Sequence, residues 1–93
     1  IKFKRGIFNL TLMKEEQIIT GITKVLEKDL KLNNLVIRRE MQAYDFEGWD
    51  SLAHIGIIIS LEEEFKLRFS IGEITNLKNI GELIDLIKMK KIK

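Results

Sequence analysis

Apolar residues recur every three or four positions over residues 14–30, as they do on one face of a helix. This face is formed by Ile18, Ile19, Ile22, Val25, Leu26 and Leu30. The spacing predicts an amphipathic first helix. The pattern breaks at Asn33 and Asn34, and residues 33–50 show no clear periodicity. A connection this long is usually functional or packed by its own side chains. We expect that packing to come from Leu35, Ile37, Met41, Tyr44, Phe46 and Trp49.

Three further helices are expected in the second half of the chain. The first runs from Ser51 to Phe65, where apolar residues are dense. A short helix starts near Ser70, because Ser70 and Glu73 have the spacing of a capping box. A last helix spans residues 79–89 and ends in lysines, which the helix dipole favours. Its apolar stripe is made of Ile80, Leu83, Ile84 and Ile87. The predicted fold class is all-α, a small four-helix bundle with a long first loop and a short third helix.

The expected helix over residues 51–65 is apolar around much of its circumference. Its apolar residues are Leu52, Ile55, Ile57, Ile58, Ile59, Leu61 and Phe65. On a wheel of 100° per residue they cover an arc of about 220°, whereas one core contact needs about 100°. Small residues, among them Ala53 and Gly56, occupy the other side. Two interpretations stay open: the bundle surrounds this helix, or part of the arc serves a partner.

The composition fits one small domain with a core. The chain has 93 residues, of which 45% are hydrophobic and 32% charged. The absence of Cys and the single His exclude disulfides, thiolate metal sites and His-rich metal sites. No apolar run has the length needed to cross a bilayer, and the short apolar stretch after the basic start is interrupted, unlike a signal peptide. We expect a cytoplasmic protein without a membrane contact.

Charge is unevenly distributed behind the net value of +2. Residues 1–12 and 88–93 together hold seven basic groups and no acid. Residues 13–87 hold the other nine basic groups and all fourteen acids, a net charge of −5. A nucleic-acid-binding domain should carry positive charge on its folded face, so the acidic body argues against that function. The basic ends are expected to be solvated tails.

The segment GWDSLAHI, residues 48–55, opens the expected second helix. Either Asp50 or Ser51 could cap this helix by accepting a hydrogen bond from one of its first N–H groups. A helix N-terminus also stabilises a phosphate, by roughly 0.3–1 kcal/mol, so a serine here suits a phosphodiester as well. His54 lies one turn after Ser51 and could reach it. A Ser–His hydrolase is not supported, because no oxyanion hole or orienting acid is evident.

Two stretches, WDSLAHIGIIISLEEEF and FSIGEITNLKNIGELIDLI, resemble the acyl carrier protein family, the phosphopantetheine-attachment domains. Asp50-Ser51-Leu52 opens the apolar helix, and the LEEEF motif closes it at the family's spacing. The resemblance covers about Met13 to Met89, which we take as the carrier domain. Residues 1–12 are then an N-terminal extension or upstream sequence, and residues 90–93 a basic C-terminal tail.

The resemblance implies a carrier rather than an enzyme. Ser51 would receive 4'-phosphopantetheine from coenzyme A through a phosphopantetheinyl transferase and Mg²⁺, and Asp50 would support the attachment. The thiol of the arm would hold an acyl or aminoacyl group as a thioester, loaded by a ligase and passed to downstream biosynthetic enzymes. Carriers of this family usually act as monomers, although the wide apolar arc of the second helix could also support a weak dimer. Residues implied in partner contacts are Leu52, Ile55, Ile59, Glu62 and Glu63.

The chain also departs from the fatty-acid-synthesis branch of that family. Carriers of that branch are strongly acidic soon after the serine, where this chain has Ala53 and Gly56. The electrostatic docking of that branch, and recognition by a transferase specialised for it, are therefore not implied here. The alternative function is a non-catalytic helical interaction module without a functional attachment site. The cargo stays open between fatty acid, polyketide, amino acid and D-alanine.

Overall fold

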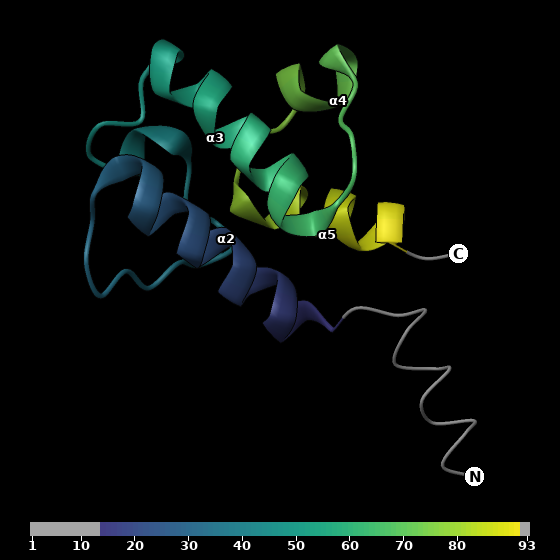
Figure 1. Ribbon diagram of the computed structural model, residues 1–93, viewed down its shortest axis with the longest axis horizontal. Coiled ribbons are helices and arrows are strands. Elements are labelled where there is room, and N and C mark those ends of the chain that lie inside the picture. Colours follow the sequence, from purple (N-terminus) through teal and green to yellow (C-terminus); the bar gives the residue numbers. More distant parts are fainter. Residues whose placement is uncertain (1–13, 92–93) are drawn as a thin grey trace, which may run out of the picture.

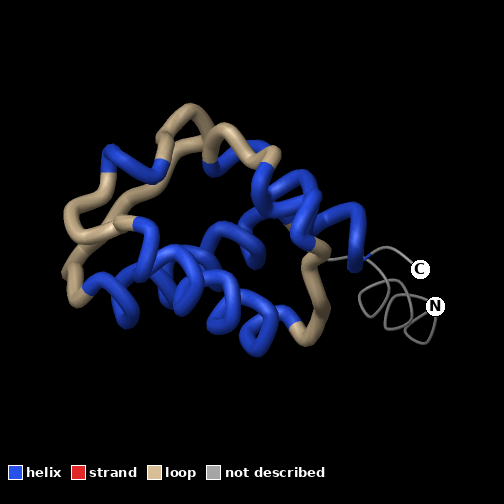
Figure 2. The backbone as a smooth tube through the Cα atoms, turned by 90° about the horizontal axis from the view of Figure 1, so that it is seen from above, coloured by secondary structure: helices blue, strands red, loops and turns tan. Residues whose placement is uncertain are grey.

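The computed structural model describes residues 14–91, so the expected N-terminal extension lies outside the described residues. The helices of the described part are α2 (Glu15–Leu30), η1 (Ala43–Asp45), α3 (Ser51–Phe65), α4 (Ile71–Thr75) and α5 (Ile80–Lys91), of which η1 is a short 3-10 helix. Figures 1 and 2 show these helices joined by loops, with no strand between residues 14 and 91. The all-α prediction and the bounds predicted for the second helix are confirmed.

Helices α2 and α3 lie side by side and form the framework of the fold (Figure 1). They are in tight contact at Gly21, where an added Cβ would lie 2.5 Å from Cζ of the buried Phe65. Further along, Ser60 Oγ donates a hydrogen bond of 2.7 Å to Asp29 Oδ2. Because the start of α2 meets the end of α3, the two helices are antiparallel. The beginning of α3 therefore lies beside the end of α2.

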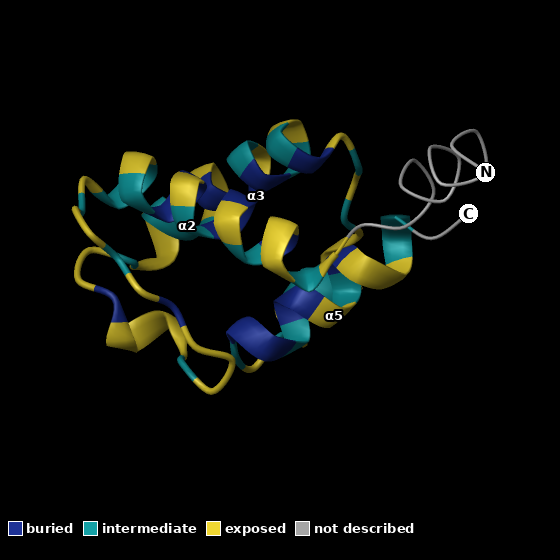
Figure 3. Cartoon of the chain, turned by 90° about the horizontal axis from the view of Figure 1, so that it is seen from below, coloured by how far each residue is buried: buried dark blue, intermediate teal, exposed yellow. Residues whose placement is uncertain are grey.

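The core is built from three helices and the long connection. Its fully buried side chains are Ile18, Ile22, Leu26, Ile57, Leu61, Ile84 and Ile87 from α2, α3 and α5. The connection adds Ile37 and Phe46, and Figure 3 shows it as a mostly exposed segment with buried positions. One expectation was wrong: Tyr44 is 78% exposed and does not pack the connection. Tyr44 belongs to η1, whose three residues are all exposed.

The connection between α2 and α3 is held against the start of α5. The N–H of Ile80 donates to the carbonyl of Met41 at 2.8 Å, and the N–H of Gly81 donates to that of Arg39 at 2.7 Å. The Arg39 guanidinium donates to Asp85 at 2.8 Å and to Glu15 at 3.2 Å. The carboxylate of Asp85 and, to a smaller extent, that of Glu15 raise the pKa of Arg39. The first N–H groups of α5 thus gain partners, as helix ends require.

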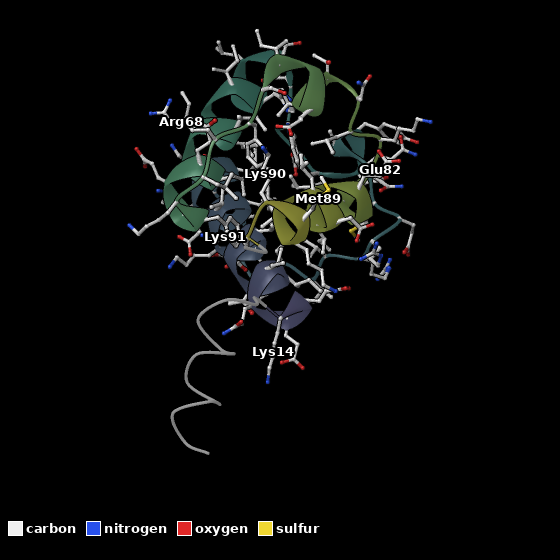
Figure 4. All side chains as sticks on the ribbon, turned by 90° about the vertical axis from the view of Figure 1, so that its right-hand side faces the viewer. Lys14, Arg68, Glu82, Met89, Lys90 and Lys91 are labelled. Atoms are coloured by element: carbon white, nitrogen blue, oxygen red, sulfur yellow. The ribbon has the colours of Figure 1, made fainter. Side chains whose placement is uncertain are left out.

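Helix α4 is short and is held at its N-terminal end. Ser70 Oγ accepts a hydrogen bond from Glu73 N, and Glu73 Oε1 accepts one from Ser70 N, which confirms the predicted capping box. Lys90 Nζ lies 3.0 Å from Glu73, and Lys91 Nζ donates to the carbonyl of Phe65 at 2.8 Å. Figure 4 shows both lysines on the last turn of α5. The basic tail predicted over residues 90–93 therefore begins too early, because α5 continues to Lys91.

Candidate functional site

Asp50, and not Ser51, is the cap of α3. Asp50 has an extended backbone, its Oδ1 accepts a hydrogen bond of 2.8 Å from Ala53 N, and its carbonyl accepts one of 2.9 Å from His54 N. Gly48 turns the chain into this position with a φ of 88°, which a glycine adopts without strain. Ser51 is the first helical residue and is exposed. Within residues 14–91 its hydroxyl has no hydrogen-bond partner.

Among residues 14–91, this arrangement leaves the Ser51 hydroxyl without a partner at the positive end of a helix. The Asp50 carboxylate satisfies one of the first N–H groups of α3, and others in that first turn remain open. The helix dipole favours a negative group beside them. An exposed serine hydroxyl in this place has room for a bulky substituent, and its helix end suits a phosphate. The local geometry therefore fits a phosphodiester on Ser51 without any rearrangement of the cap.

His54 is engaged by Trp49 rather than by Ser51. Trp49 Nε1 donates a hydrogen bond of 3.1 Å to His54 Nδ1, and the two rings are stacked with centroids 6.1 Å apart. An imidazole whose Nδ1 accepts a hydrogen bond carries its proton on Nε2. Phe46 continues this cluster, with its ring centroid 5.5 Å from that of Trp49. His54 thus has a packing role, which argues further against a Ser–His hydrolase.

A cavity of about 470 Å³ opens beside this aromatic pair. It lies between α3, η1 and the segment that leads into α5, and is lined by Gln42, Ala43, Tyr44, Trp49, His54, Ile58, Leu61, Leu77, Lys78, Asn79 and Leu83. Trp49 and His54, which flank Ser51 in the chain, line the cavity, whereas Ser51 itself does not. The sequence did not predict this cavity or the Trp49–His54 bond. The only signal in the sequence was that two residues with aromatic rings, Trp49 and His54, lie on either side of the cap residue Asp50.

The apolar arc of α3 is divided between the core and the surface. Ile57, Ile58, Leu61 and Phe65 are buried. Leu52, Ile55 and Ile59 are 81%, 61% and 51% exposed, and we call these three residues the exposed stripe. The stripe starts directly after Ser51 and continues for two turns. The bundle therefore does not surround α3, and the interpretation that part of the arc serves a partner is favoured.

The two glutamates predicted for partner contacts differ in their surroundings. Glu62 is half-buried, and its Oε2 accepts a hydrogen bond of 2.9 Å from Phe69 N. It therefore holds the turn after α3. Glu63 is exposed.

Between residues 14 and 91 no cluster of His, Cys, Asp and Glu could hold a metal ion, and none of the helices there has the length and hydropathy to cross a membrane.

Comparison with known proteins gives one family. The model of the phosphopantetheine attachment site family matches residues 20–87. An acyl carrier protein of Acidothermus cellulolyticus is 27% identical over 75 residues, which are 81% of this chain and 89% of that protein. One of Exiguobacterium sibiricum is 25% identical over 76 residues, with 82% and 96% covered.

The fold has a counterpart among solved structures. The solution structure of holo acyl carrier protein from Geobacter metallireducens superposes with a TM-score of 0.71 at 38% sequence identity. The match covers 77% of this chain and 83% of that one.

Proposed function

The chain belongs to the phosphopantetheine attachment family of acyl carrier proteins, and on that premise we propose that Ser51 is the residue that bears the arm. The observation that carries this proposal is that two neighbouring residues at the start of α3 have different surroundings. Asp50 caps the helix, while the Ser51 hydroxyl is exposed and has no hydrogen-bond partner among residues 14–91. No other serine of the described part combines exposure with the first turn of a long helix.

The cofactor of the family is 4'-phosphopantetheine, and its source is coenzyme A. In the attachment step, Ser51 Oγ forms a bond to the phosphorus that joins the arm to the nucleotide. The P–O bond to adenosine 3',5'-bisphosphate breaks, and the serine proton passes to the transferase. The new phosphodiester would lie at the positive end of α3. Asp50 would keep this helix end in place, and its free carboxylate oxygen would help the transferase to hold Mg²⁺.

We infer a non-catalytic role for the protein itself. Its chain offers no reactive sulfur, so the thiol that carries cargo comes with the arm. The cavity of about 470 Å³ beside Trp49 and His54 would shelter part of an acyl or aminoacyl group between enzymatic steps. The exposed stripe would contact the transferase, the acyl or aminoacyl ligase and the downstream enzymes. Glu63 is free to join it, whereas Glu62 supports the turn after α3. We propose a monomer that acts in the cytoplasm.

The test is attachment of the arm. The full chain is incubated with coenzyme A, Mg²⁺ and a broad-specificity phosphopantetheinyl transferase, and the intact mass and tryptic peptides are measured. We expect one phosphopantetheine on the peptide that contains Ser51 and none on Ser51→Ala. Because Asp50 is the cap, Ser51→Ala should lower the free energy of unfolding by less than about 0.5 kcal/mol. Persistent absence of labelling would instead support a helical interaction module without an attachment site.

A further inference from the structure

The cavity beside Trp49 and His54 combines aliphatic walls with a few polar side chains, and no acid lines it. Its volume is about 470 Å³, and its aliphatic side chains are those of Ile58, Leu61, Leu77 and Leu83. Its polar side chains are those of Gln42, Tyr44, Trp49, His54, Lys78 and Asn79. An apolar pocket of this size with a small number of polar groups is typical of a small-molecule site, in which the polar groups decide the specificity.

His54 is the polar lining residue that lies closest to Ser51 on α3. The two residues are one helical turn apart, and side chains at this spacing have Cβ atoms about 5–6 Å apart. His54 is also the first residue of α3 after Ser51 that lines the cavity. An arm on Ser51 would reach the cavity by folding back over this turn of the helix. The part of the cargo next to the thioester would then lie beside His54.

Trp49 fixes the orientation and the proton of the His54 ring. Trp49 Nε1 donates to His54 Nδ1 at 3.1 Å, so the single proton of the neutral ring is on Nε2. The stacking of the two rings, with centroids 6.1 Å apart, restricts rotation of the imidazole. Within residues 14–91 no acceptor is bonded to Nε2 of this half-buried side chain. The cavity lining therefore includes a donor of fixed orientation that an oxygen atom of a ligand can engage.

The charge around the cavity opposes a cationic ligand. Lys78 is the only charged residue of the lining, and its ammonium forms no ion pair with another of residues 14–91. Three acids are close in the chain but do not line the cavity, and each accepts a hydrogen bond from a backbone N–H; they are Asp45, Asp50 and Glu82. An ammonium group that entered the cavity would lose its water without gaining a carboxylate partner, which is costly.

We propose that His54, oriented by Trp49, is a specificity-determining residue for the cargo, and that its Nε2–H donates to the 3-oxo oxygen of a 3-oxoacyl group. This inference rests on the proposed function, because only an arm on Ser51 delivers an acyl group to this place. The thioester carbonyl is common to every cargo and cannot discriminate. A saturated acyl group leaves the donor without this acceptor, and an aminoacyl group brings an ammonium into a cavity without a carboxylate.

The experiment measures how well the cavity shelters three cargoes of equal chain length. Hexanoyl, 3-oxohexanoyl and 2-aminohexanoyl groups are transferred with the arm from their coenzyme A thioesters to Ser51 of the full chain by the broad-specificity transferase. Each loaded carrier is exposed to 2-mercaptoethanol, and mass spectrometry follows the exchange of the acyl group onto this thiol. The protection factor is the exchange rate of the same acyl group on free pantetheine divided by its rate on the carrier. This ratio removes the difference in intrinsic reactivity between the cargoes.

We expect the protection factor of 3-oxohexanoyl to exceed that of hexanoyl by about 3- to 10-fold, as one hydrogen bond contributes, and that of 2-aminohexanoyl to be the lowest. His54→Leu should abolish this preference, because it removes the donor and keeps an apolar side chain. His54→Gln should restore part of it, because its amide offers donors again. The matched control is Tyr44→Phe, which removes another donor from the lining and leaves the Trp49–His54 hydrogen bond in place. It should keep the wild-type preference.

Trp49→Phe tests whether Trp49 orients His54. The variant keeps an aromatic ring and removes the N–H that bonds to Nδ1. We expect the preference for 3-oxohexanoyl to fall, and the nitrogen NMR signals of His54 to show its proton shared between Nδ1 and Nε2. The chain has one His and one Trp, so these signals need no further assignment. Equal losses of protection for all cargoes, with unchanged signals of His54, would show that Trp49 only packs against the cavity and would overturn its positioning role.

The selectivity itself has clear contrary outcomes. Equal protection of the three cargoes, or a preference that survives His54→Leu, would overturn the inference. A preference that is lost in Tyr44→Phe would also overturn it, because the donor would then be the tyrosine hydroxyl. Circular dichroism verifies that each variant is folded. Absence of any arm on Ser51 would contradict the proposed function, whereas a loaded carrier without the preference would contradict only this inference.

Discussion

Asp50 and Ser51 are neighbours with opposite roles. The carboxylate of Asp50 accepts a hydrogen bond from the N–H of Ala53, while the hydroxyl of Ser51 has no hydrogen-bond partner among residues 14–91. If a serine capped the helix, its modification would break the hydrogen bond between its side chain and the helix N–H. The lost cap would cost about 0.5–2 kcal/mol. With the cap on the preceding residue, the modification leaves the helix end unchanged. The helix therefore loses its cap only when Asp50 is replaced, and not when Ser51 is modified.

The two roles proposed for Asp50 can be separated by substitution. Asn is as good a cap as Asp, so Asp50→Asn should leave the free energy of unfolding within about 0.5 kcal/mol of wild type. It should nevertheless slow arm transfer, because the amide cannot hold Mg²⁺ as a carboxylate does. Asp50→Ala should lose both the cap, about 0.5–2 kcal/mol, and the fast transfer. Urea unfolding and transfer rates are measured on the same samples. Wild-type rates for Asp50→Asn would show that the carboxylate serves only the cap.

The close contact between α2 and α3 is a property of the helix pair. A Cβ on Gly21 would lie 2.5 Å from Cζ of Phe65, which is 2% exposed and cannot move freely. Gly21→Ala should therefore lower the free energy of unfolding by about 1–3 kcal/mol, as overpacking does. The matched control is Gly56→Ala in α3, where a Cβ would meet nothing within 4 Å. This change should raise stability by up to about 1 kcal/mol through helix propensity.

Chemical denaturation of both glycine variants measures the difference. A Gly21→Ala protein as stable as Gly56→Ala would mean that Phe65 moves aside without loss, and that the two helices are not in tight contact at this place. The sequence offered no sign of the contact, because Gly21 falls within a helical pattern in which a glycine only lowers propensity.

Helix α4 should respond to acid. The N–H of Ser70 and, next, the ammonium of Lys90 hold the pKa of Glu73 below its ordinary value of 4.5. A folded-state pKa below the unfolded value gives stability that is present above the unfolded pKa and is lost as pH falls through the folded pKa. The amides of Ile74 and Thr75 should thus exchange faster as pH drops below about 4.5, after correction for intrinsic rates.

The control for this acid response is Glu73→Gln. Its amide oxygen can still accept from Ser70 N, but it does not titrate and does not pair with Lys90. Protection of the α4 amides should then be lower at neutral pH and independent of pH in the acid range. Hydrogen exchange followed by NMR gives both profiles. If the wild-type profile were also flat, the capping box and the Lys90 pair would contribute nothing to α4.

At the scale of the whole molecule, the local patterns were readable and the contacts between distant segments were not. Periodicity placed the helix over residues 51–65, and the Ser70–Glu73 spacing placed the start of α4, because both depend on neighbours in sequence. The end of α5 was predicted too early, because Lys90 and Lys91 resemble a basic tail in the sequence. In the structure Lys90 pairs with Glu73, and Lys91 donates to the Phe65 carbonyl. The cavity depends on five segments at once, so no local pattern reports it.

The candidate site shows the same division. Asp50-Ser51-Leu52 marked the start of α3, and its wheel showed more apolar surface than a core needs. That surplus is now accounted for by the exposed stripe. The choice between the two caps, however, depended on backbone geometry that two adjacent polar residues do not reveal. Glu62 and Glu63 look equivalent in sequence, and they differ only because Phe69 N folds back to Glu62.

The last prediction concerns how much of docking the stripe provides. An apolar side chain that becomes buried contributes about 1.5–3 kcal/mol, whereas an exposed ion pair contributes about 0.2–1 kcal/mol. Ile59→Asp should therefore lower kcat/KM for arm transfer by about tenfold or more, mainly through KM, while Glu63→Ala should change it by less than about threefold. Wild-type kcat/KM should fall only modestly between low and physiological salt, because apolar contact is screened less than exposed charge.

The control for the stripe is Val36→Asp, which places the same charge on an apolar side chain that is exposed in the connection before α3. It should transfer the arm at the wild-type rate if α3 alone forms the contact. All three variants are checked by circular dichroism and measured with the broad-specificity transferase across the same salt range. Equal losses for Ile59→Asp and Val36→Asp would mean that added negative charge, and not a lost apolar contact, weakens docking. A harmless Ile59→Asp would show that the docking surface lies away from the stripe.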